Sequence, residues 1–109
     1  MNQLTAIIPC KNEIENLEEC LASVRPVADE ILIADSGSQD GTLDLIQRQP
    51  DCRLIQRQYI HSGHFKNWAI PQARHNWVLV IDADERITPA LAVEIQQRLA
   101  EASDVDGYW

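Results

Sequence analysis

Three short apolar runs along the chain predict buried β-strands. They cover residues 4–8, 30–34 and 77–81, and each is rich in Ile, Leu or Val without regular polar alternation. Strands that are covered on both faces of a sheet have this continuous pattern, whereas half-exposed strands alternate. A weaker run at residues 53–57 is a fourth candidate. The pattern therefore predicts a sheet that lies between layers of helices.

Apolar residues at helical spacing separate these strands and predict four helices. Asn12 and Glu15 resemble a capping box at the start of the first helix, and Asp40 can cap the second. Pro71 falls inside the third helix and should kink or end it. Thr88 precedes a proline in the cap position of the last helix. The four predicted helices cover residues 12–25, 41–49, 64–74 and 88–102.

The alternation of strands and helices predicts one α/β domain with a right-handed, mostly parallel sheet. Its length of 109 residues is enough to bury a core. Residues 104–109 have the pattern of a loop that leads into a further strand. We therefore expect residues 1–109 to be an incomplete domain, whose open strand edges could drive dimerisation or bind a completing second chain.

Composition limits the classes of partner. The formal net charge of −8 gives no basic surface for nucleic acid, although a divalent cation could still bring a phosphate to acidic side chains. Three cysteines without metal-binding spacing favour reduced thiols in the cytoplasm. Neither a signal peptide nor an apolar span of about 20 residues is present in this sequence. We expect a cytoplasmic protein, which could act at the inner face of a membrane.

Polar and acidic residues follow three of the predicted strands. In a parallel sheet these carboxyl ends share one edge, which is where α/β folds bind ligands. Asp82 and Asp84 follow the strand at 77–81, and alternate residues of an extended chain point the same way. Such a pair could share one hard cation that also binds substrate phosphates. The alternative is a solvated acidic turn before a capped helix.

The other two strand ends offer groups for a nucleotide. Asp35 could accept a hydrogen bond from a base N–H, and Gly37 permits a tight turn close to a ligand. An ordinary βα turn has the same composition. Glu13 could bind a ribose hydroxyl, or simply favour the start of a helix. Lys66, near another helix start, could meet a diphosphate or be a solvated surface lysine.

Four ordered motifs, at residues 7–13, 35–42, 66–69 and 82–85, resemble those of family 2 glycosyltransferases. The branch that adds sugars to the lipopolysaccharide core is the most similar. The resemblance implies a GT-A fold, a nucleotide-sugar donor that is commonly a UDP-sugar, and a glycan or lipid-linked acceptor at the cell surface. It also implies a divalent cation, Mn²⁺ or Mg²⁺.

The resemblance assigns roles to individual residues. Pro9 and Glu13 would line the nucleoside pocket, Asp35 would face the base, Asp82 would lie near the ribose or metal, and Asp84 would coordinate the metal. The candidates for donor binding are Pro9, Asn12, Glu13, Asp35, Ser36, Gly37, Lys66 and Asp82, and those for metal binding are Asp82 and Asp84. A departure is Cys10-Lys11, where the family often has a small hydroxyl residue and an aromatic residue.

An inverting transferase also needs a general base, and the family has it in the acceptor-binding half. This chain stops 25 residues after Asp84, so we name no catalytic residue. The leading hypothesis is a metal-dependent inverting transferase or its donor-binding part. A non-catalytic nucleotide-binding or interaction module is the alternative, and a fragment without function is another. A receiver-like signalling domain is disfavoured because Pro9-Cys10 replaces the paired acids expected after the first strand.

Overall fold

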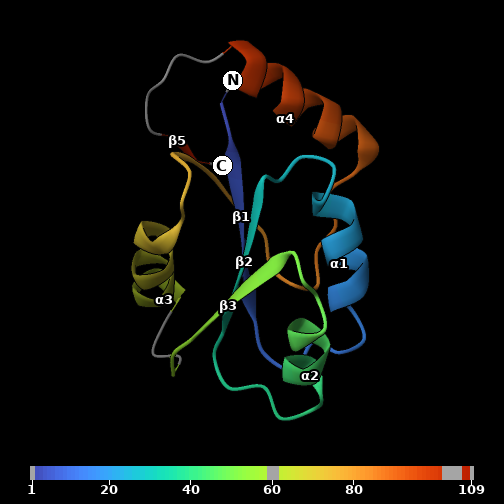
Figure 1. Ribbon diagram of the computed structural model, residues 1–109, viewed down its shortest axis with the longest axis vertical. Helices are drawn as coiled ribbons and strands as arrows, with labels where there is room; N and C mark the ends of the chain where they lie inside the picture. The colour runs from blue at the N-terminus through green and yellow to red at the C-terminus, as the bar shows by residue number, and fades with distance from the viewer. Residues whose placement is uncertain (1, 59–61, 102–106, 109) are drawn as a thin grey trace.

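The computed structural model describes residues 2–58, 62–101 and 107–108. Its centre is a five-stranded parallel sheet with the strand order β3-β2-β1-β4-β5 (Figure 1). The strands are β1 (Leu4–Cys10), β2 (Glu30–Asp35), β3 (Cys52–Gln56), β4 (Trp77–Val80) and β5 (Gly107–Tyr108). The predicted parallel α/β fold is confirmed, and so is the strand after the last helix.

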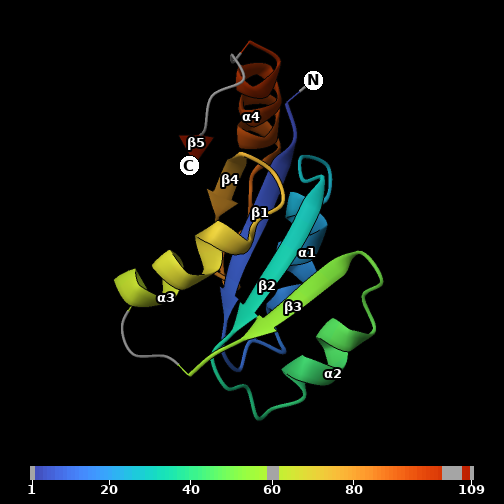
Figure 2. The same cartoon turned by 60° about the vertical axis from the view of Figure 1, so that its left-hand side comes forward.

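Helices cover both faces of this sheet. The helices are α1 (Leu17–Val24), α2 (Thr42–Gln47), α3 (Ser62–Ala69), the 3₁₀ helix η1 (Ile70–Gln72) and α4 (Pro89–Glu101). Figures 1 and 2 show α1, α2 and α4 on one face and α3 on the other. The three layers explain why the strand sequences are continuous apolar runs, since helices cover both faces of the sheet.

Two apolar clusters fill the spaces between the layers. Leu4, Ala6 and Ile8 of β1 belong to the larger cluster, which includes residues of α1, α2 and α4. Ile7 belongs to the smaller cluster, which includes Phe65 of α3. Consecutive side chains of β1 therefore enter opposite layers, as the two-residue period of a strand requires.

The first helix begins later than predicted. Helix α1 starts at Leu17, and Asn12 has a φ of 55°, which is incompatible with a right-handed α-helix. The backbone N–H groups of Asn12, Glu13 and Ile14 instead donate to side chains of the second βα loop, at 2.9, 3.1 and 3.3 Å. These tertiary hydrogen bonds replace the capping box, so the prediction of a helix from Asn12 was wrong.

Other helix ends agree more closely with the sequence. The hydroxyl of Thr88 accepts the N–H of Leu91 at 3.1 Å, which confirms the predicted cap of α4. Leu91 itself is 41% exposed, so only the later part of its predicted apolar stripe is buried. Helix α3 ends at Ala69 and continues as η1, which includes Pro71. Among the described residues, no helix is long and apolar enough to cross a membrane.

Candidate functional site

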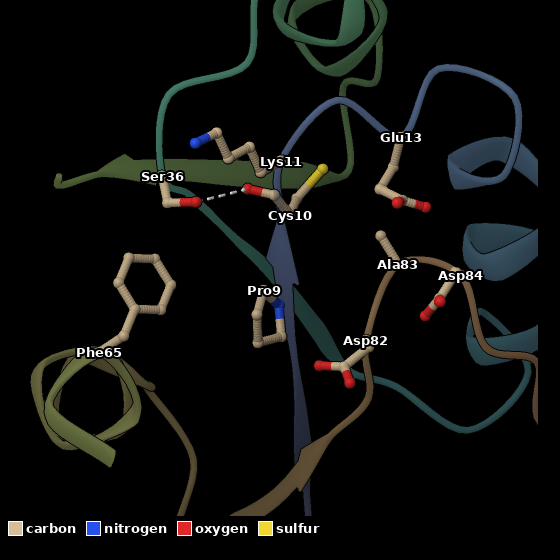
Figure 3. A pocket seen from close by; sticks show the side chains of 9 residues that line it. All are labelled: Pro9, Cys10, Lys11, Glu13, Ser36, Phe65, Asp82, Ala83 and Asp84. Carbon is tan, nitrogen blue, oxygen red and sulfur yellow. Dashed lines mark hydrogen bonds between the residues drawn. The ribbon is translucent and has the colours of Figure 1, made fainter. Parts of the chain in front are cut away.

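The loops that follow β1, β2 and β4 meet at the carboxyl edge of the sheet and, with α3, line an open cavity of about 220 Å³. Its walls are Pro9, Cys10, Lys11, Glu13, Ser36, Phe65, Asp82, Ala83 and Asp84 (Figure 3). Five of the predicted site residues are among them: Pro9, Glu13, Ser36, Asp82 and Asp84. We call this space the first cavity.

The acidic residues lie on a turn rather than on an extended strand. Strand β4 ends at Val80, and the N–H of Glu85 donates to the Asp82 carbonyl at 2.9 Å. The Glu85 carboxylate accepts the N–H of Asp82 at 2.9 Å, which closes the turn from its other side. We call residues 82–85 the acidic turn. The expectation of an extended Asp-Ala-Asp segment was wrong, because Glu85 folds the chain back on itself.

The acidic turn leaves two carboxylates available for a ligand. Asp82 and Asp84 are exposed, and in the described part of the chain neither carboxylate has a hydrogen bond or ion pair. Figure 3 shows both carboxylates on the opposite side of the first cavity from Phe65. The residues described contain no group of three or more His, Cys, Asp or Glu that could hold a metal. A cation here would therefore need ligands from a bound substrate or water as well.

Asp35 closes the turn that follows β2. Its Oδ2 accepts the N–H groups of Gly37 and Ser38, both at 2.9 Å, and its Oδ1 accepts the Ser38 hydroxyl. Gly37 has a φ of 122°, a backbone conformation that favours glycine. Asp35 has no exposed surface, and its carboxylate's partners among the described residues belong to its own turn.

A second cavity of about 420 Å³ lies between the ends of β2 and β3. Its walls are Asp35, Ser36, Gly37, Gln56, Arg57 and Gln58. Ser36 lines both cavities, and its hydroxyl donates to the Cys10 carbonyl at 3.4 Å (Figure 3). The Arg57 guanidinium lies 5.7 Å from the ring centroid of Trp68, which links β3 to α3. One ligand could thus extend from the first cavity past Ser36 into the second.

Two predicted site residues line neither cavity. Asn12 accepts the N–H of Gln39 at 2.6 Å through its side chain, and so helps to join the first two βα loops. Lys66 is exposed on α3, whereas its neighbour Phe65 lines the first cavity. The structure therefore brings Lys66 into contact with neither cavity, and Asn12 shapes the edge without facing the ligand space.

Several residues of the cavity walls were not predicted from the sequence. Gln56 and Arg57 follow the weakest strand pattern, although the rule that ligands bind at strand ends applies to them equally. Lys11 is the one basic residue among the nine that line the first cavity. For Phe65 the sequence indicated only a place on the apolar face of a helix and no role in a site. Arg86 lines neither cavity but adjoins the acidic turn, and its charge alone did not distinguish it from a surface arginine.

The Cys10 thiol in the wall of the first cavity is expected to be unreactive near neutral pH. Burial raises its pKa to about 12, and the carboxylates of Asp35, Glu13 and Asp40 add to that effect. Because the thiolate is the nucleophilic form, a thiol with this pKa is a poor nucleophile near neutral pH. Cys10 therefore contributes shape to the cavity and not covalent chemistry.

Comparison with known proteins places the chain in a family. Residues 5–109 match the family model described as "Glycosyl transferase family 2". This match agrees with the parallel α/β sheet and confirms the GT-A fold that the motifs imply.

Three relatives show how much of a longer protein this chain resembles. The lipopolysaccharide core biosynthesis glycosyltransferase LpsC of Rhizobium meliloti is 36% identical, over 96% of this chain and 40% of LpsC. A glycosyltransferase of Rickettsia bellii is 31% identical, over 86% of this chain and 32% of its own length. A TPR repeat-containing protein of Synechococcus elongatus is 32% identical, over 91% and 25% respectively. The chain thus spans 40% or less of the length of these relatives.

Proposed function

Because this chain belongs to glycosyltransferase family 2, we propose that it is the donor-binding part of an inverting, metal-dependent transferase. Its proposed donor is a nucleotide-sugar, and its proposed acceptor is a cell-surface glycan or lipopolysaccharide, as the name of LpsC suggests. The observation that carries this proposal is the pair of carboxylates, Asp82 and Asp84, in the wall of a cavity at the carboxyl edge of the sheet, where neither has a partner among the described residues.

A UDP-sugar would have to use both cavities. The first cavity, at about 220 Å³, is below the size of about 300–1,000 Å³ that is typical of small-molecule sites. We assign the base to the second cavity, whose walls include Asp35, Ser36 and Gly37. Ser36 lies between the two cavities, so the ribose and diphosphate would continue from there into the first.

The groups proposed for the ribose and diphosphate all line the first cavity. Glu13 is half-buried, and its Oε2 accepts the side-chain N–H of Asn16 at 3.1 Å, which leaves Oε1 for a ribose hydroxyl. Pro9 has no N–H and offers a flat surface beside it. The diphosphate would lie toward the acidic turn, with Lys11 as a nearby cation. We propose no direct contact between Lys66 and the diphosphate, because Lys66 lies outside both cavities.

The donor set at the acidic turn suits a hard divalent cation. Carboxylate oxygens are preferred by Mg²⁺ and Mn²⁺, and Mg²⁺ commonly takes only one or two protein carboxylates together with substrate phosphates. Asp84 and Asp82 would hold this ion. When bound, such an ion neutralises the charge that develops on a nucleoside-diphosphate leaving group.

The chain's own residues account for the donor side of the reaction. The general base that receives the acceptor proton is not assigned to residues 1–109, and neither are contacts to the acceptor. We propose that the remaining groups come from the acceptor-binding half or a second chain. We also propose that the reaction takes place in the cytoplasm, at the inner face of the membrane.

The alternative is a non-catalytic module that binds a nucleotide and partners another chain. Both candidates predict nucleotide binding, and only the transferase predicts turnover of a UDP-sugar. An assay for released UDP in the presence of a lipopolysaccharide acceptor therefore distinguishes the two.

Calorimetric titration of UDP, with and without Mn²⁺, tests the donor site itself. We expect Mn²⁺ to increase the affinity, and Asp84→Ala to abolish that increase. Asp44→Ala is a matched control, because Asp44 is an exposed carboxylate on α2 that lines neither cavity. Absence of binding of UDP and of other nucleotides by folded protein would contradict both candidates.

A further inference from the structure

We propose that Arg86 is a positioning residue that braces the acidic turn and Glu13 in the arrangement that binds cation and nucleotide. This inference rests on the proposed function, since it concerns the same site. Arg86 itself lines neither cavity, and its guanidinium lies behind the acidic turn, between that turn and α1.

The first half of the brace holds the acidic turn. Nη1 of Arg86 donates to the Glu85 carbonyl at 2.9 Å and to the Ala83 carbonyl at 3.4 Å. These two carbonyl groups lie on either side of Asp84 in the chain. A donor shared between them therefore fixes the backbone that presents the Asp84 carboxylate, while the carboxylate itself has no partner within residues 2–58, 62–101 and 107–108.

The second half of the brace reaches the other wall of the first cavity. Nη2 of Arg86 donates to Asn16 Oδ1 at 3.2 Å, and Nδ2 of the same amide donates to Glu13 Oε2 at 3.1 Å. Nε of Arg86 forms an ion pair with Glu19 at 3.3 Å, which orients the guanidinium against α1. A continuous series of hydrogen bonds thus connects the Glu13 carboxylate to the backbone on both sides of Asp84.

This geometry needs a guanidinium. Arginine offers five N–H groups in a rigid plane, so its nitrogens can reach carbonyls on one side and α1 on the other. A lysine ammonium is a single point charge that cannot span both partners. Groups that orient metal ligands in this way affect metal binding although they never touch the ion.

The positioning role of Arg86 and its positive charge have opposite expected effects on Mn²⁺ affinity. A cation beside two carboxylates opposes the binding of a second cation, so loss of its charge alone would strengthen Mn²⁺ binding. Loss of the hydrogen bonds that Arg86 donates would instead weaken Mn²⁺ binding. Arg86→Lys keeps the charge and removes the planar fork, and Arg86→Met removes both. Arg98→Lys is the matched control, because Arg98 is an exposed arginine on α4 that pairs with Glu94.

The experiment measures UDP affinity by calorimetry in Mn²⁺ and in EDTA, and Mn²⁺ affinity alone by electron paramagnetic resonance. For Arg86→Lys and Arg86→Met we expect Mn²⁺ affinity to fall about 10- to 100-fold, the usual effect of losing an outer partner of a metal site. We expect UDP affinity in EDTA to fall less, because without the cation only one of the two braced groups, Glu13, would contact the nucleotide. A purely structural role would lower both affinities together with the melting temperature.

The outcomes separate this inference from the proposed function. Wild-type affinity for Mn²⁺ in Arg86→Lys, or increased affinity in Arg86→Met, would overturn the positioning role while leaving the donor site intact. If the unaltered protein bound UDP equally with Mn²⁺ and with EDTA, the metal-dependent function and the positioning role would both be overturned. Arg98→Lys should match the unaltered protein throughout.

Discussion

The backbone N–H of Asn12 donates a hydrogen bond to the hydroxyl of Ser38 at 2.9 Å, across the gap between the first two βα loops. The Asn12 side chain completes the connection by accepting the N–H of Gln39 at 2.6 Å. Residues from two separate loops thus form one unit at the carboxyl edge of the sheet. The positive φ of Asn12 is what turns its N–H and side chain toward the second loop.

Replacement of Asn12 should destabilise the fold in a residue-dependent way. Asn12→Ala loses the acceptor for Gln39, and alanine tolerates a φ of 55° less well than asparagine does, so we expect a loss of about 1–2 kcal/mol in unfolding free energy. Asn12→Gly loses only the hydrogen bond and should be less affected. Urea denaturation measures both, with Asn67→Ala, at an exposed position of α3, as control. Equal stability of the Ala and Gly variants would show that the backbone conformation contributes nothing.

Asp35 offers a test of how the second loop is held. Asp35→Ala removes the acceptor of two N–H groups, and that of Ser38 is buried, whereas that of Gly37 is on an exposed residue; the loss should cost about 1–3 kcal/mol. Asp35→Asn should cost less, because its amide oxygen can accept both N–H groups while its NH₂ donates to the Ser38 hydroxyl. Denaturation curves of the two variants, beside Asp44→Ala, check this order. An Asn variant as unstable as the Ala variant would mean that the negative charge is essential to the turn.

The sequence was sufficient to predict the sheet and the edge that carries the site. Apolar runs such as 4–8 remain unbroken because helices cover both faces, so the fold class follows from periodicity. Parallel strands place the residues after β1, β2 and β4 at one edge, so Glu13, Ser36 and Asp82 were expected to be neighbours, and they line one cavity. These predictions depend only on strand order and direction.

The start of α1 was predicted too early because the helix start depends on contacts between residues far apart in the chain. The groups that satisfy the backbone of residues 12–14 come from Ser38, Asp40 and Thr42, which lie 26 to 29 residues away in the chain. The acidic turn is a more local case, in which the competing partner, Glu85, is within reach of Asp82.

The opposite end of the sheet should control stability in acid. Glu30 accepts the Thr5 hydroxyl at 2.8 Å and the Arg74 N–H at 2.9 Å, and it forms an ion pair with Arg53 at 3.0 Å. Burial alone would raise the pKa of Glu30, but these hydrogen bonds and the Arg53 charge outweigh it and lower the pKa below its ordinary 4.5. The folded state therefore releases this proton more readily than the unfolded state does.

It follows that Glu30 stabilises the protein above pH 4.5 and that this contribution is lost as the pH falls through the lowered pKa. Glu30→Gln should lower the unfolding free energy at pH 7 by about 1.5–3 kcal/mol, since hydrogen bonds to a charged group are lost. The same variant should have a flatter dependence between pH 5 and pH 3. Urea titrations over this range provide the measurement, with exposed Glu94→Gln as control. Parallel pH curves for Glu30→Gln and the unaltered protein would contradict the assignment.

Stability at alkaline pH should depend on Cys10, which is 4% exposed. Its pKa is raised from an ordinary 9.0 to about 12, so the unfolded chain releases the thiol proton at a pH where the folded chain still holds it. Between these two values the unfolding free energy should fall as the pH rises, by at most about 1.4 kcal/mol per pH unit for this one group. The sign follows from the folded state having the higher affinity for the proton.

Cys10→Ala separates this effect from the other groups that titrate in base. The variant should lose packing energy at every pH, because a buried side chain becomes smaller, and this gives a constant offset from the unaltered protein. Its decline above pH 9 should nevertheless be shallower, so the two curves converge. Cys52, whose pKa is also raised to about 12, remains in both proteins and cancels in the comparison. Curves that stay parallel from pH 8 to pH 11, or rapid alkylation of native Cys10 by iodoacetamide at pH 8, would show that the thiol is not protected by burial.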